Sequence, residues 1–464
     1  MQKKIYWIFF LVFGISISAC NSDDDGPGTI PDKSGLIESV FIKNEENNSL
    51  RVKVNVKFTK DVDFYLRYKE KEGTEFQQTP LVKTVRIINT TLVLLKADTE
   101  YEMEVVFPGQ SENTVSNTYN FKTGKLPADI QECVLEQNNL ASELPGYILL
   151  MKRDAPGFAC ITDTKGHIVW YEPVPDGVQV AKFDPRTNTI YAITGNGKHQ
   201  YTGTTLLEID LYGNIVLEKD IQDLYPHHDI VKNGDGDYMI VNFVPKVFDL
   251  TSIGGYKEHT VFGDGYTILS PDGTVKSKWD CFTELNPLKD PPDVLTNNYD
   301  QDWIHANSIN YDSEGNYYMT FNNTSEMWKI DGRSGKVLYR VGEHGNVELS
   351  PEYYADGLHA ARPVKPDEVL VLDNGMEKGR NRAMVYSIDP VGKKASVKLD
   401  IATDPKYYSP YMGNVQFIDG YDMLLFCGTM ANALVFTDIK GKELRVIRTT
   451  FLSYRAEYIP KIIL

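Results

Sequence analysis

The sequence has few cysteines, a deficit of positive charge and only one long apolar run. Its 464 residues contain five cysteines, and their spacing matches no metal-binding or redox motif. Lysine and arginine together number 48, against 64 aspartates and glutamates, so the formal net charge is −16. A surface this acidic argues against nucleic acid and against electrostatic docking on anionic lipid. It does not exclude an anionic substrate held in a local pocket.

Four of the cysteines lie outside the N-terminal segment. They are Cys133, Cys160, Cys281 and Cys427. In an oxidising compartment they allow at most two disulfide bonds, whose pairing the sequence does not determine. Buried free thiols are the alternative.

The one long apolar run lies at the N-terminus. It extends from Ile5 to Ile17 behind two lysines and is too short to cross a bilayer comfortably as a helix. Residues 17–20 resemble a bacterial lipobox, so we expect a lipoprotein signal peptide over residues 1–19 and a lipid on Cys20. The alternative is an ordinary signal peptide with a chance cysteine.

The segment after Cys20 is rich in Asp, Gly and Pro, which predicts an acidic tether over residues 20–34. A lipid at the start of this tether would anchor an otherwise soluble protein. We therefore expect the protein in the outer membrane of a cell envelope, on the periplasmic or the cell-surface face. Its contact with the membrane is expected to be through the lipid only.

Twenty-eight tyrosines and few helical periods favour an all-β protein, and the length allows two domains. Residues 35–124 alternate in short strands. Within them, the segment from Leu95 to Tyr101 resembles the tyrosine corner of fibronectin type III domains, in which the tyrosine hydroxyl bonds to the preceding turn. We predict a small immunoglobulin/fibronectin-III-like β-sandwich here that serves as a structural module or spacer.

Residues 126–464 contain six repeats of a strand, an aspartate near a glycine turn and a second strand. The marker aspartates, 47 to 62 residues apart, are Asp163, Asp210, Asp272, Asp331, Asp389 and Asp438. Six hairpins at this spacing predict a six-bladed β-propeller, whereas a barrel or a double sandwich does not explain the sixfold pattern. Insertions at 245–265 and 281–303 are expected to form the rim of the pocket.

Three successive repeats carry a histidine ahead of an acidic turn and an apolar strand. These histidines are His227, which is followed by His228, then His305 and His359. Repeats place equivalent residues at equivalent points, so we expect the rings to converge at the mouth of the central channel. Three interpretations are open: hydrogen bonds to neighbouring blades, ligation of a metal such as zinc, and a nucleophile with two partners that bind a transferred anion.

The order of these motifs behind a small β-sandwich is similar to that in the bacterial aryl-sulfate sulfotransferases. The motifs are HHD at 227–229, DWIHANS at 302–308, and HA at 359–360 followed by DNG at 373–375. The resemblance covers the propeller, and the N-terminal region in architecture only. It implies transfer of a sulfo group from an aryl sulfate to a phenol by a ping-pong route through a sulfohistidine, with no nucleotide donor, cofactor or metal.

The resemblance also implies roles for individual residues. His359 matches the nucleophile, and His305 and Asn307 match the pair that contacts the sulfo group. His227 is favoured as the third histidine, because alignment of its motif with that of His305 places it in register, and His228 is kept as the alternative. A second histidine is suited to move protons to and from the phenols, because its pKa lies near neutrality.

One departure from the family pattern concerns a cation. Where the family has an arginine, this chain has Asn322 and Asn323, which we predict to bind the substrate instead. Arg362, Arg380 and Arg382 are candidates to supply the charge, although Arg380 is better explained as a structural ion-pair partner. Aromatic side chains expected near the rim, where they could stack on a phenolic ring, are Trp303, Tyr353, Tyr354, Tyr408 and Tyr411.

The sequence thus predicts an aryl-sulfate sulfotransferase with an aryl sulfate donor and a phenolic acceptor as its partners, and a homodimer is one option for its assembly. The alternative of a different class is a non-catalytic, surface-exposed propeller that binds a glycan or a protein. A metal-dependent hydrolase with three histidine ligands is the third reading. Loss of His359 separates the enzyme, which needs it, from the binding protein, which tolerates its loss.

Overall fold

The structure is a computed structural model that describes residues 32–110 and 112–464. In this part of the chain every regular element is a strand or a single turn of 3-10 helix, so the all-β prediction is confirmed. The predicted signal peptide, Cys20 and residues 20–31 of the predicted tether lie outside the described residues. Among the residues described, no helix has the length and apolar character that a bilayer-spanning segment needs.

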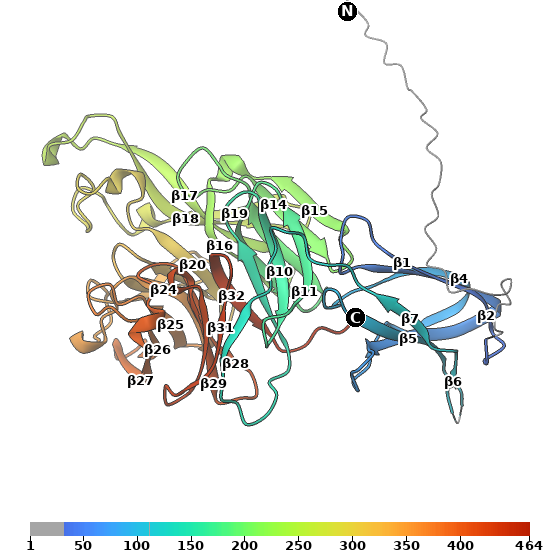
Figure 1. The fold of residues 1–464 in the computed structure, drawn as a ribbon. Coiled ribbons are helices and arrows are strands. Elements are labelled where there is room, and N and C mark those ends of the chain that lie inside the picture. Colours follow the sequence, from blue (N-terminus) through green and yellow to red (C-terminus); the bar gives the residue numbers. More distant parts are fainter. Residues whose placement is uncertain (1–31, 111) are drawn as a thin grey trace, which may run out of the picture.

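The N-terminal region is a seven-stranded sheet built around one long strand (Figure 1, blue). Its strands are β1 (Ile37–Asn44), β2 (Val52–Glu70), β3 (Gln77–Gln78), β4 (Val82–Leu92), β5 (Glu100–Phe107), β6 (Thr114–Val115) and β7 (Tyr119–Lys122). The first part of β2 pairs with β1 and β4, and its second part pairs with β3 and β5. This region has its own apolar core, and its division into two packed layers stays a prediction.

The predicted tyrosine corner is present in the N-terminal region. The backbone N–H of Lys96 donates to the Tyr101 hydroxyl at 2.8 Å. The ring of Tyr101 is buried and stacks on Phe121 with 5.3 Å between centroids. The residue pattern between Leu95 and Tyr101 therefore identified a local contact correctly.

The rest of the chain forms six antiparallel sheets, which are the blades of a propeller. From the inner to the outer strand, blade 1 is β32 (Ser453–Ile459), β9 (Tyr147–Lys152), β10 (Gly157–Asp163) and β11 (Ile168–Val174), and blade 2 is β12 (Val178–Asp184), β13 (Thr189–Thr194), β14 (Thr205–Asp210) and β15 (Ile215–Asp220). Blade 3 is β16 (Pro226–Lys232), β17 (Tyr238–Phe248), β18 (His259–Leu269) and β19 (Val275–Asp280), and blade 4 is β20 (Ala306–Tyr311), β21 (Tyr317–Phe321), β22 (Glu326–Ile330) and β23 (Val337–Val341). Blade 5 is β24 (Leu358–Lys365), β25 (Glu368–Asp373), β26 (Arg382–Asp389) and β27 (Lys394–Ala402), and blade 6 is β28 (Asn414–Ile418), β29 (Met423–Gly428), β30 (Ala433–Asp438) and β31 (Glu443–Arg448), with β8 (Val134–Asn138) added outside β31.

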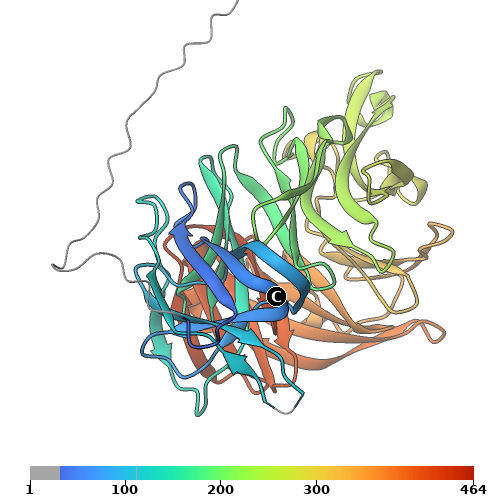
Figure 2. The ribbon, with the colours of Figure 1, turned by 90° about the vertical axis from the view of Figure 1, so that its right-hand side faces the viewer.

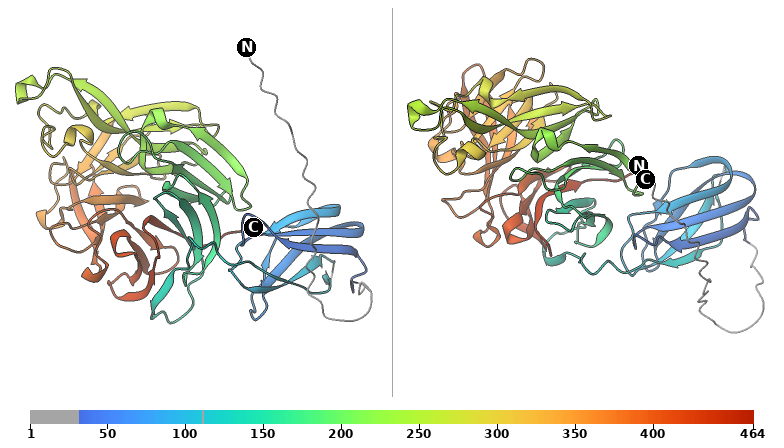
Figure 3. Two further views of the ribbon diagram at one scale, coloured as in Figure 1. Left: turned by 45° about the horizontal axis from the view of Figure 1, so that its top comes forward. Right: turned by 90° about the horizontal axis from the view of Figure 1, so that it is seen from above.

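The six inner strands form a closed ring around the channel. Each of β12, β16, β20, β24, β28 and β32 contacts the next, and β32 contacts β12 in turn. The blades follow one another around this ring in chain order, from green through yellow and orange to red (Figure 3, left). The prediction of a six-bladed propeller is confirmed. Blade 1 is completed by β32, which comes from far downstream of β9.

Strand burial follows from the way in which blades stack. Every residue of β12 and β13 is buried, because inner strands are covered by a neighbouring blade on both faces. β13 therefore reads as a run of apolar and β-branched residues rather than as an alternating one, whereas β12 also buries Gln179, Lys182 and Asp184. The outermost strand β15 is exposed or half-buried along its whole length. The apolar cores lie between blades and stabilise the ring by removing these faces from water.

The marker aspartates lie at the hairpins that join the third and fourth strands of the blades. Asp210 shows their role: its carboxylate accepts the backbone N–H groups of Tyr212 and Asn214 and so closes the turn. The third repeat differs from the prediction, because Ser270 occupies the place of the aspartate. Its backbone pairs with Thr274 as Asp210 pairs with Asn214, and Asp272 lies within the turn.

Single 3-10 turns occur only in connections between strands of the described chain. They are η1 (Gln222–Leu224), η2 (Thr251–Ile253), η3 (Cys281–Thr283), η4 (Tyr299–Gln301), η5 (Pro351–Tyr353), η6 (Pro405–Tyr407) and η7 (Thr429–Ala431). The insertion expected at 245–265 is largely a hairpin, because β17 and β18 extend beyond their blade (Figure 1, upper left). The second insertion, 281–303, contains η3 and η4. All four cysteines outside the N-terminal segment are buried and free.

The N-terminal region lies against one side of the propeller, at blade 1 (Figures 1 and 2). The side-chain amide of Asn48 donates to the carbonyl of Tyr171 at 2.8 Å, and Arg51 pairs with Glu172 at 2.5 Å. Tyr171 and Glu172 belong to β11, the outermost strand of its blade. The contact is therefore on the outer edge of the ring, away from the channel.

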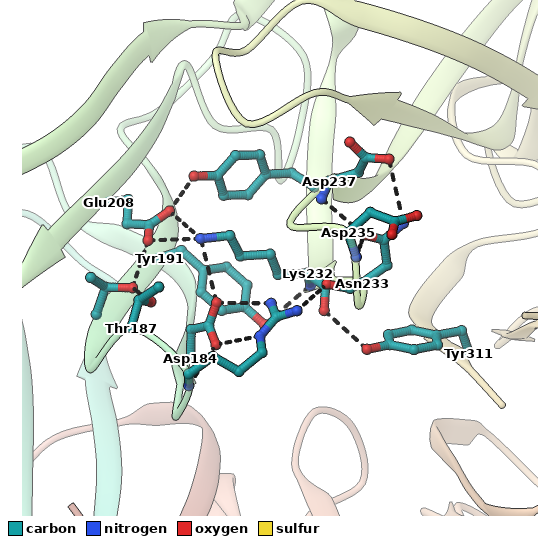
Figure 4. A network of polar contacts seen from close by, with 12 residues as sticks. Asp184, Thr187, Tyr191, Glu208, Lys232, Asn233, Asp235, Asp237 and Tyr311 are labelled. Carbon is teal, nitrogen blue, oxygen red and sulfur yellow. Dashed lines mark hydrogen bonds and ion pairs between the residues drawn. The ribbon is translucent and has the colours of Figure 1, made fainter. Parts of the chain in front are cut away.

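Blades 2 and 3 are joined by a buried ion network (Figure 4). Lys232 donates to both carboxylate oxygens of Glu208 at 2.8 and 2.9 Å and lies 3.4 Å from Asp184. Arg186 binds the same Asp184 and donates to the carbonyl of Asn233 in blade 3. One cation between two carboxylates thus fixes the spacing of these blades.

Replacement of Lys232 by methionine is expected to destabilise the protein by about 3 kcal/mol, because a buried carboxylate pair loses its cation. The comparison is the urea midpoint and melting temperature of the variant against wild type. Lys440→Met, at an exposed hairpin of blade 6, is the matched control and is expected to leave both unchanged. Equal stability of the two variants would contradict a stabilising role for the network.

Candidate functional site

The predicted histidines converge at the central channel. His227 and His228 lie on β16, His305 directly precedes β20, and His359 lies on β24. The rings of His228 and His305 have centroids 4.6 Å apart, and the Nδ1 atoms of His227 and His228 are 2.6 Å apart. His359 is close enough to His228 for the two rings to interact electrostatically. The expected convergence is confirmed.

The histidines do not, however, occupy three equivalent backbone positions. The equivalent backbone positions are Tyr225, His305 and Gly357. The carbonyl of each accepts a hydrogen bond from the second strand of its blade or from the residue that follows that strand. Each also has a positive φ angle, of 53°, 56° and 83° respectively. His227 lies two residues after Tyr225, and His359 lies two residues after Gly357, whereas His305 is itself at the equivalent position. The register that places His227 opposite His305 is therefore wrong, because sequence spacing does not count the bulges of the inner strands.

His359 is held as a neutral imidazole, with Asn322 and Asn374 beside it. Its Nδ1 lies 3.2 Å from the carbonyl oxygen of Gly357 and 3.5 Å from the amide nitrogen of Asn322. The shorter contact makes Nδ1 a donor, so Nε2 carries the lone pair. Burial, together with the positive charge of Arg455, lowers the pKa of His359 to about 3. Gly357 gives the turn its left-handed backbone without strain.

The surroundings of His305 favour its protonated form. Its Nδ1 lies 2.5 Å from a carboxylate oxygen of Asp302. Burial by itself lowers the pKa of His305, but the Asp302 carboxylate more than offsets this, and the net direction is upward. The protonated ring donates to Asp302 through Nδ1 and has Nε2–H left to donate to another group.

His228 has the opposite tendency. Burial and the neighbouring charges of His305 and His227 hold its pKa well below the usual range, so the ring is neutral at neutral pH. The site therefore combines two rings that favour the neutral form, His228 and His359, with one that favours the cation, His305. Such divergent environments assign proton donors and acceptors within an active site.

The three predicted asparagines differ in what they contact. Asn307 lies two residues after His305, so in blade 4 it occupies the position of His227 in blade 3 and of His359 in blade 5. Its side-chain amide donates to the carbonyl of Leu358 and so connects β20 to β24. Asn322 touches His359. Asn323 instead donates to the carbonyls of the Asp302 segment, so its amide supports that segment.

The cation of the site is Arg455, which the sequence did not single out. It lies on β32, is buried, and donates to the carbonyl oxygen of Asn307 at 2.5 Å. One of its other nitrogens lies 3.8 Å from Asp229. Among the described residues, its Nε is buried without a hydrogen-bond partner. A guanidinium beside His359 with an unused donor is suited to an anionic ligand.

The three arginines predicted as candidates lie elsewhere. Arg382 pairs with Asp373 at 2.9 Å in the interior of blade 5, and Arg380 is exposed on the loop before it. Arg362 is further along β24, where its charge acts on the buried Lys182. Arg382 is thus the structural ion-pair partner.

Tyr201 and Arg153, which the sequence did not single out, lie on the exposed side of the histidines. Tyr201 is 48% exposed and its ring lies edge-on to His228 and His305, with centroids 5.7 and 6.3 Å away. Arg153 lies 5.8 Å from the centre of the Tyr201 ring. Trp303, in contrast, is wholly buried.

The arrangement is suited to transfer of an anionic group. Nε2 of His359 offers a lone pair, while His305 and Arg455 offer positive donors. Across residues 32–110 and 112–464, no group of three or more His, Cys, Asp or Glu side chains is placed to hold a metal ion.

The family model described as Arylsulfotransferase (ASST) matches residues 134–451, which is well over half of the chain. The chain belongs to the arylsulfotransferase family. No curated protein matches it significantly. The family match spans blades 2 to 6 and all of blade 1 except β32, so Arg455 lies just outside the matched segment.

Several solved structures are similar to this chain. A protein of unknown function from Bacteroides caccae is 13% identical, with a TM-score of 0.44 over 68% of this chain and 100% of its own. A functionally unknown protein from Desulfotomaculum acetoxidans is 10% identical, with a TM-score of 0.41 over 77% and 95%. The Myceliophteria thermophila Cps50 (Swd1) β-propeller domain is 11% identical, with a TM-score of 0.40 over 69% and 90%.

Proposed function

We propose that this arylsulfotransferase moves a sulfo group from an aryl sulfate to a phenol by a ping-pong route in which His359 is the nucleophile. The observation that carries the proposal is the state of His359: its Nδ1–H donates to Gly357, and burial keeps the ring neutral, so Nε2 has a free lone pair. A protonated imidazole could not attack.

In the first half-reaction, Nε2 of His359 attacks sulfur, and the bond from sulfur to the phenolic oxygen breaks. The electron pair leaves with that oxygen. His305, as an imidazolium, and the free Nε of Arg455 donate to sulfo or phenolic oxygens as negative charge shifts toward the leaving group. In the second half-reaction, an acceptor phenol attacks the sulfohistidine, and the bond from nitrogen to sulfur breaks.

Tyr201 supports an aromatic substrate at this site. Its exposed ring beside His228 and His305 provides a face on which a phenolic ring can stack. We further propose that the protein acts in the outer membrane of a cell envelope, held by a lipid on Cys20.

The test is release of 4-nitrophenol from its sulfate ester, with and without phenol, together with detection of phenyl sulfate. Phenol-dependent release and stoichiometric phenyl sulfate are the expected results. Release without phenol sulfation would indicate hydrolysis. No release from any aryl sulfate, combined with binding of a glycan or protein, would favour the non-catalytic propeller.

Asp302→Asn is expected to move the alkaline limb of the pH profile to lower pH. His305 donates only while protonated, so activity falls as pH rises through its pKa. Asp302 raises that pKa, and without its charge burial alone would lower it. The measurement is kcat/KM against pH. Asp300→Asn, on the same loop but paired with His259, is the control, and an unmoved limb in both variants would rule out His305 as the titrating group.

A further inference from the structure

The carboxylate of Asp264 lies behind the histidines with almost no partners. Asp264 belongs to β18, is wholly buried, and among the described residues neither of its oxygens has a hydrogen bond of good geometry. Its nearest ionisable partner is His227, whose Nε2 lies 3.3 Å away. Buried carboxylates without partners are costly, so this one has a function or fixes a neighbour.

His227 connects this carboxylate to the site. Its ring is wholly buried and stacks on Phe243 with 3.9 Å between centroids, which fixes the ring plane. The Nδ1 atoms of His227 and His228 are 2.6 Å apart. At this distance one nitrogen donates a proton and the other accepts it, so the tautomers of the two rings are coupled.

We propose that Asp264, acting through His227, fixes the tautomer of His228 so that its Nε2 is the base for the acceptor phenol. The carboxylate accepts the Nε2 proton of His227, which leaves Nδ1 of His227 as an acceptor. Nδ1 of His227 then accepts a hydrogen bond from Nδ1–H of His228, so Nε2 of His228 keeps its lone pair. Asp264 and His227 are positioning residues, and this inference rests on the function proposed above.

The backbone of blade 3 supports this assignment. Between Pro226 and Ile230, β16 has one more residue than β20 has between the paired positions Ala306 and Ile309. His228 has a left-handed conformation with φ of 56°, and Ala360, which follows His359 in blade 5, has the same conformation with φ of 54°. Within β16 the ring of His228 lies 4.6 Å from that of His305, whereas Nε2 of His227 lies 3.3 Å from Asp264.

The proton balance of the second half-reaction follows. The phenol transfers its proton to Nε2 of His228 as its oxygen attacks sulfur, and the electron pair of the breaking bond returns to Nε2 of His359. The imidazolium formed is compensated by Asp264 through His227. The proton then passes to the phenolate of the first half-reaction or to solvent, so atoms and charge balance over one turnover.

Asp264→Asn tests the proposal by separating the two half-reactions. A carboxamide can donate as well as accept, so the tautomer is no longer fixed. We expect the burst of 4-nitrophenol without acceptor to persist, and transfer to phenol to slow by about 100-fold or more. The loss should shrink for more acidic phenols, which need less help from a base. Asp272→Asn, in the exposed turn of the same blade, is the control.

A purely structural role for Asp264 would lower the burst amplitude and the transfer rate together, whatever the acidity of the phenol, and would overturn the proposal. A second measurement does not depend on activity. Spectra of ¹⁵N-histidine-labelled protein, assigned with His227→Gln and His228→Gln, report which nitrogen of each ring carries the proton. Protonation of His228 at Nδ1 is expected, and protonation at Nε2 overturns the inference even if sulfo transfer occurs. Absence of sulfo transfer in wild type would instead count against the proposed function.

Discussion

His359→Ala is expected to remove phenol-dependent release of 4-nitrophenol, with a fall in kcat of about 10⁴-fold or more. In the mechanism proposed above, His305 donates a proton and the Nε2 lone pair of His228 serves the acceptor phenol. Neither ring is therefore expected to replace the lost nucleophile. Initial rates at saturating donor and acceptor, with the fold of the variant checked by its melting temperature, measure the effect.

His344→Ala is the matched control for this substitution. His344 is exposed on the segment after β23, and its ring takes no part in the site. Its loss should leave the rate unchanged. A variant without His359 that still forms phenyl sulfate at a comparable rate would contradict covalent transfer through this residue.

Arg455→Met is expected to lower kcat/KM by about 100-fold to 1000-fold, the loss typical when one donor to a developing negative charge is removed. The fold should survive, because Asp229 keeps its ion pair with Lys182 at 2.8 Å. The side chain of methionine fills most of the volume but cannot donate. Steady-state rates over a range of donor concentrations give kcat and KM separately.

Arg380→Met provides the comparison, because Arg380 is exposed on the loop before β26. It should retain full activity. If both variants kept wild-type kinetics, the positive charge near His359 would not contribute to transfer. If only Arg380→Met lost activity, the cation would have to come from the loop.

The six repeats and the convergence of the histidines could be predicted because each depends on local sequence. A short turn that contains an aspartate, such as Asp210, recurs in all six hairpins, so six such turns count six blades. In the third repeat the same turn is closed by Ser270, and the prediction missed this because serine and aspartate accept the same backbone N–H groups.

Other features depend on contacts that sequence spacing does not reveal. Arg455 meets His359 only because β32 joins a blade whose other strands precede it by 300 residues. Asp264 lies opposite His227 through the pairing of β17 with β18, and no motif marks it. The register of His305 was misjudged because bulges add residues to inner strands without changing the sequence pattern. Each of these depends on tertiary pairing rather than on local pattern.

The closure of blade 1 has a consequence for how the protein matures. Met151 of β9 donates its backbone N–H to Ser453, 302 residues away, and Arg455 arrives on the same strand. The ring therefore stays open until residues 453–459 have paired with β9. A chain clipped before β32 keeps the imidazoles but has no guanidinium, so we expect it to lack sulfo transfer.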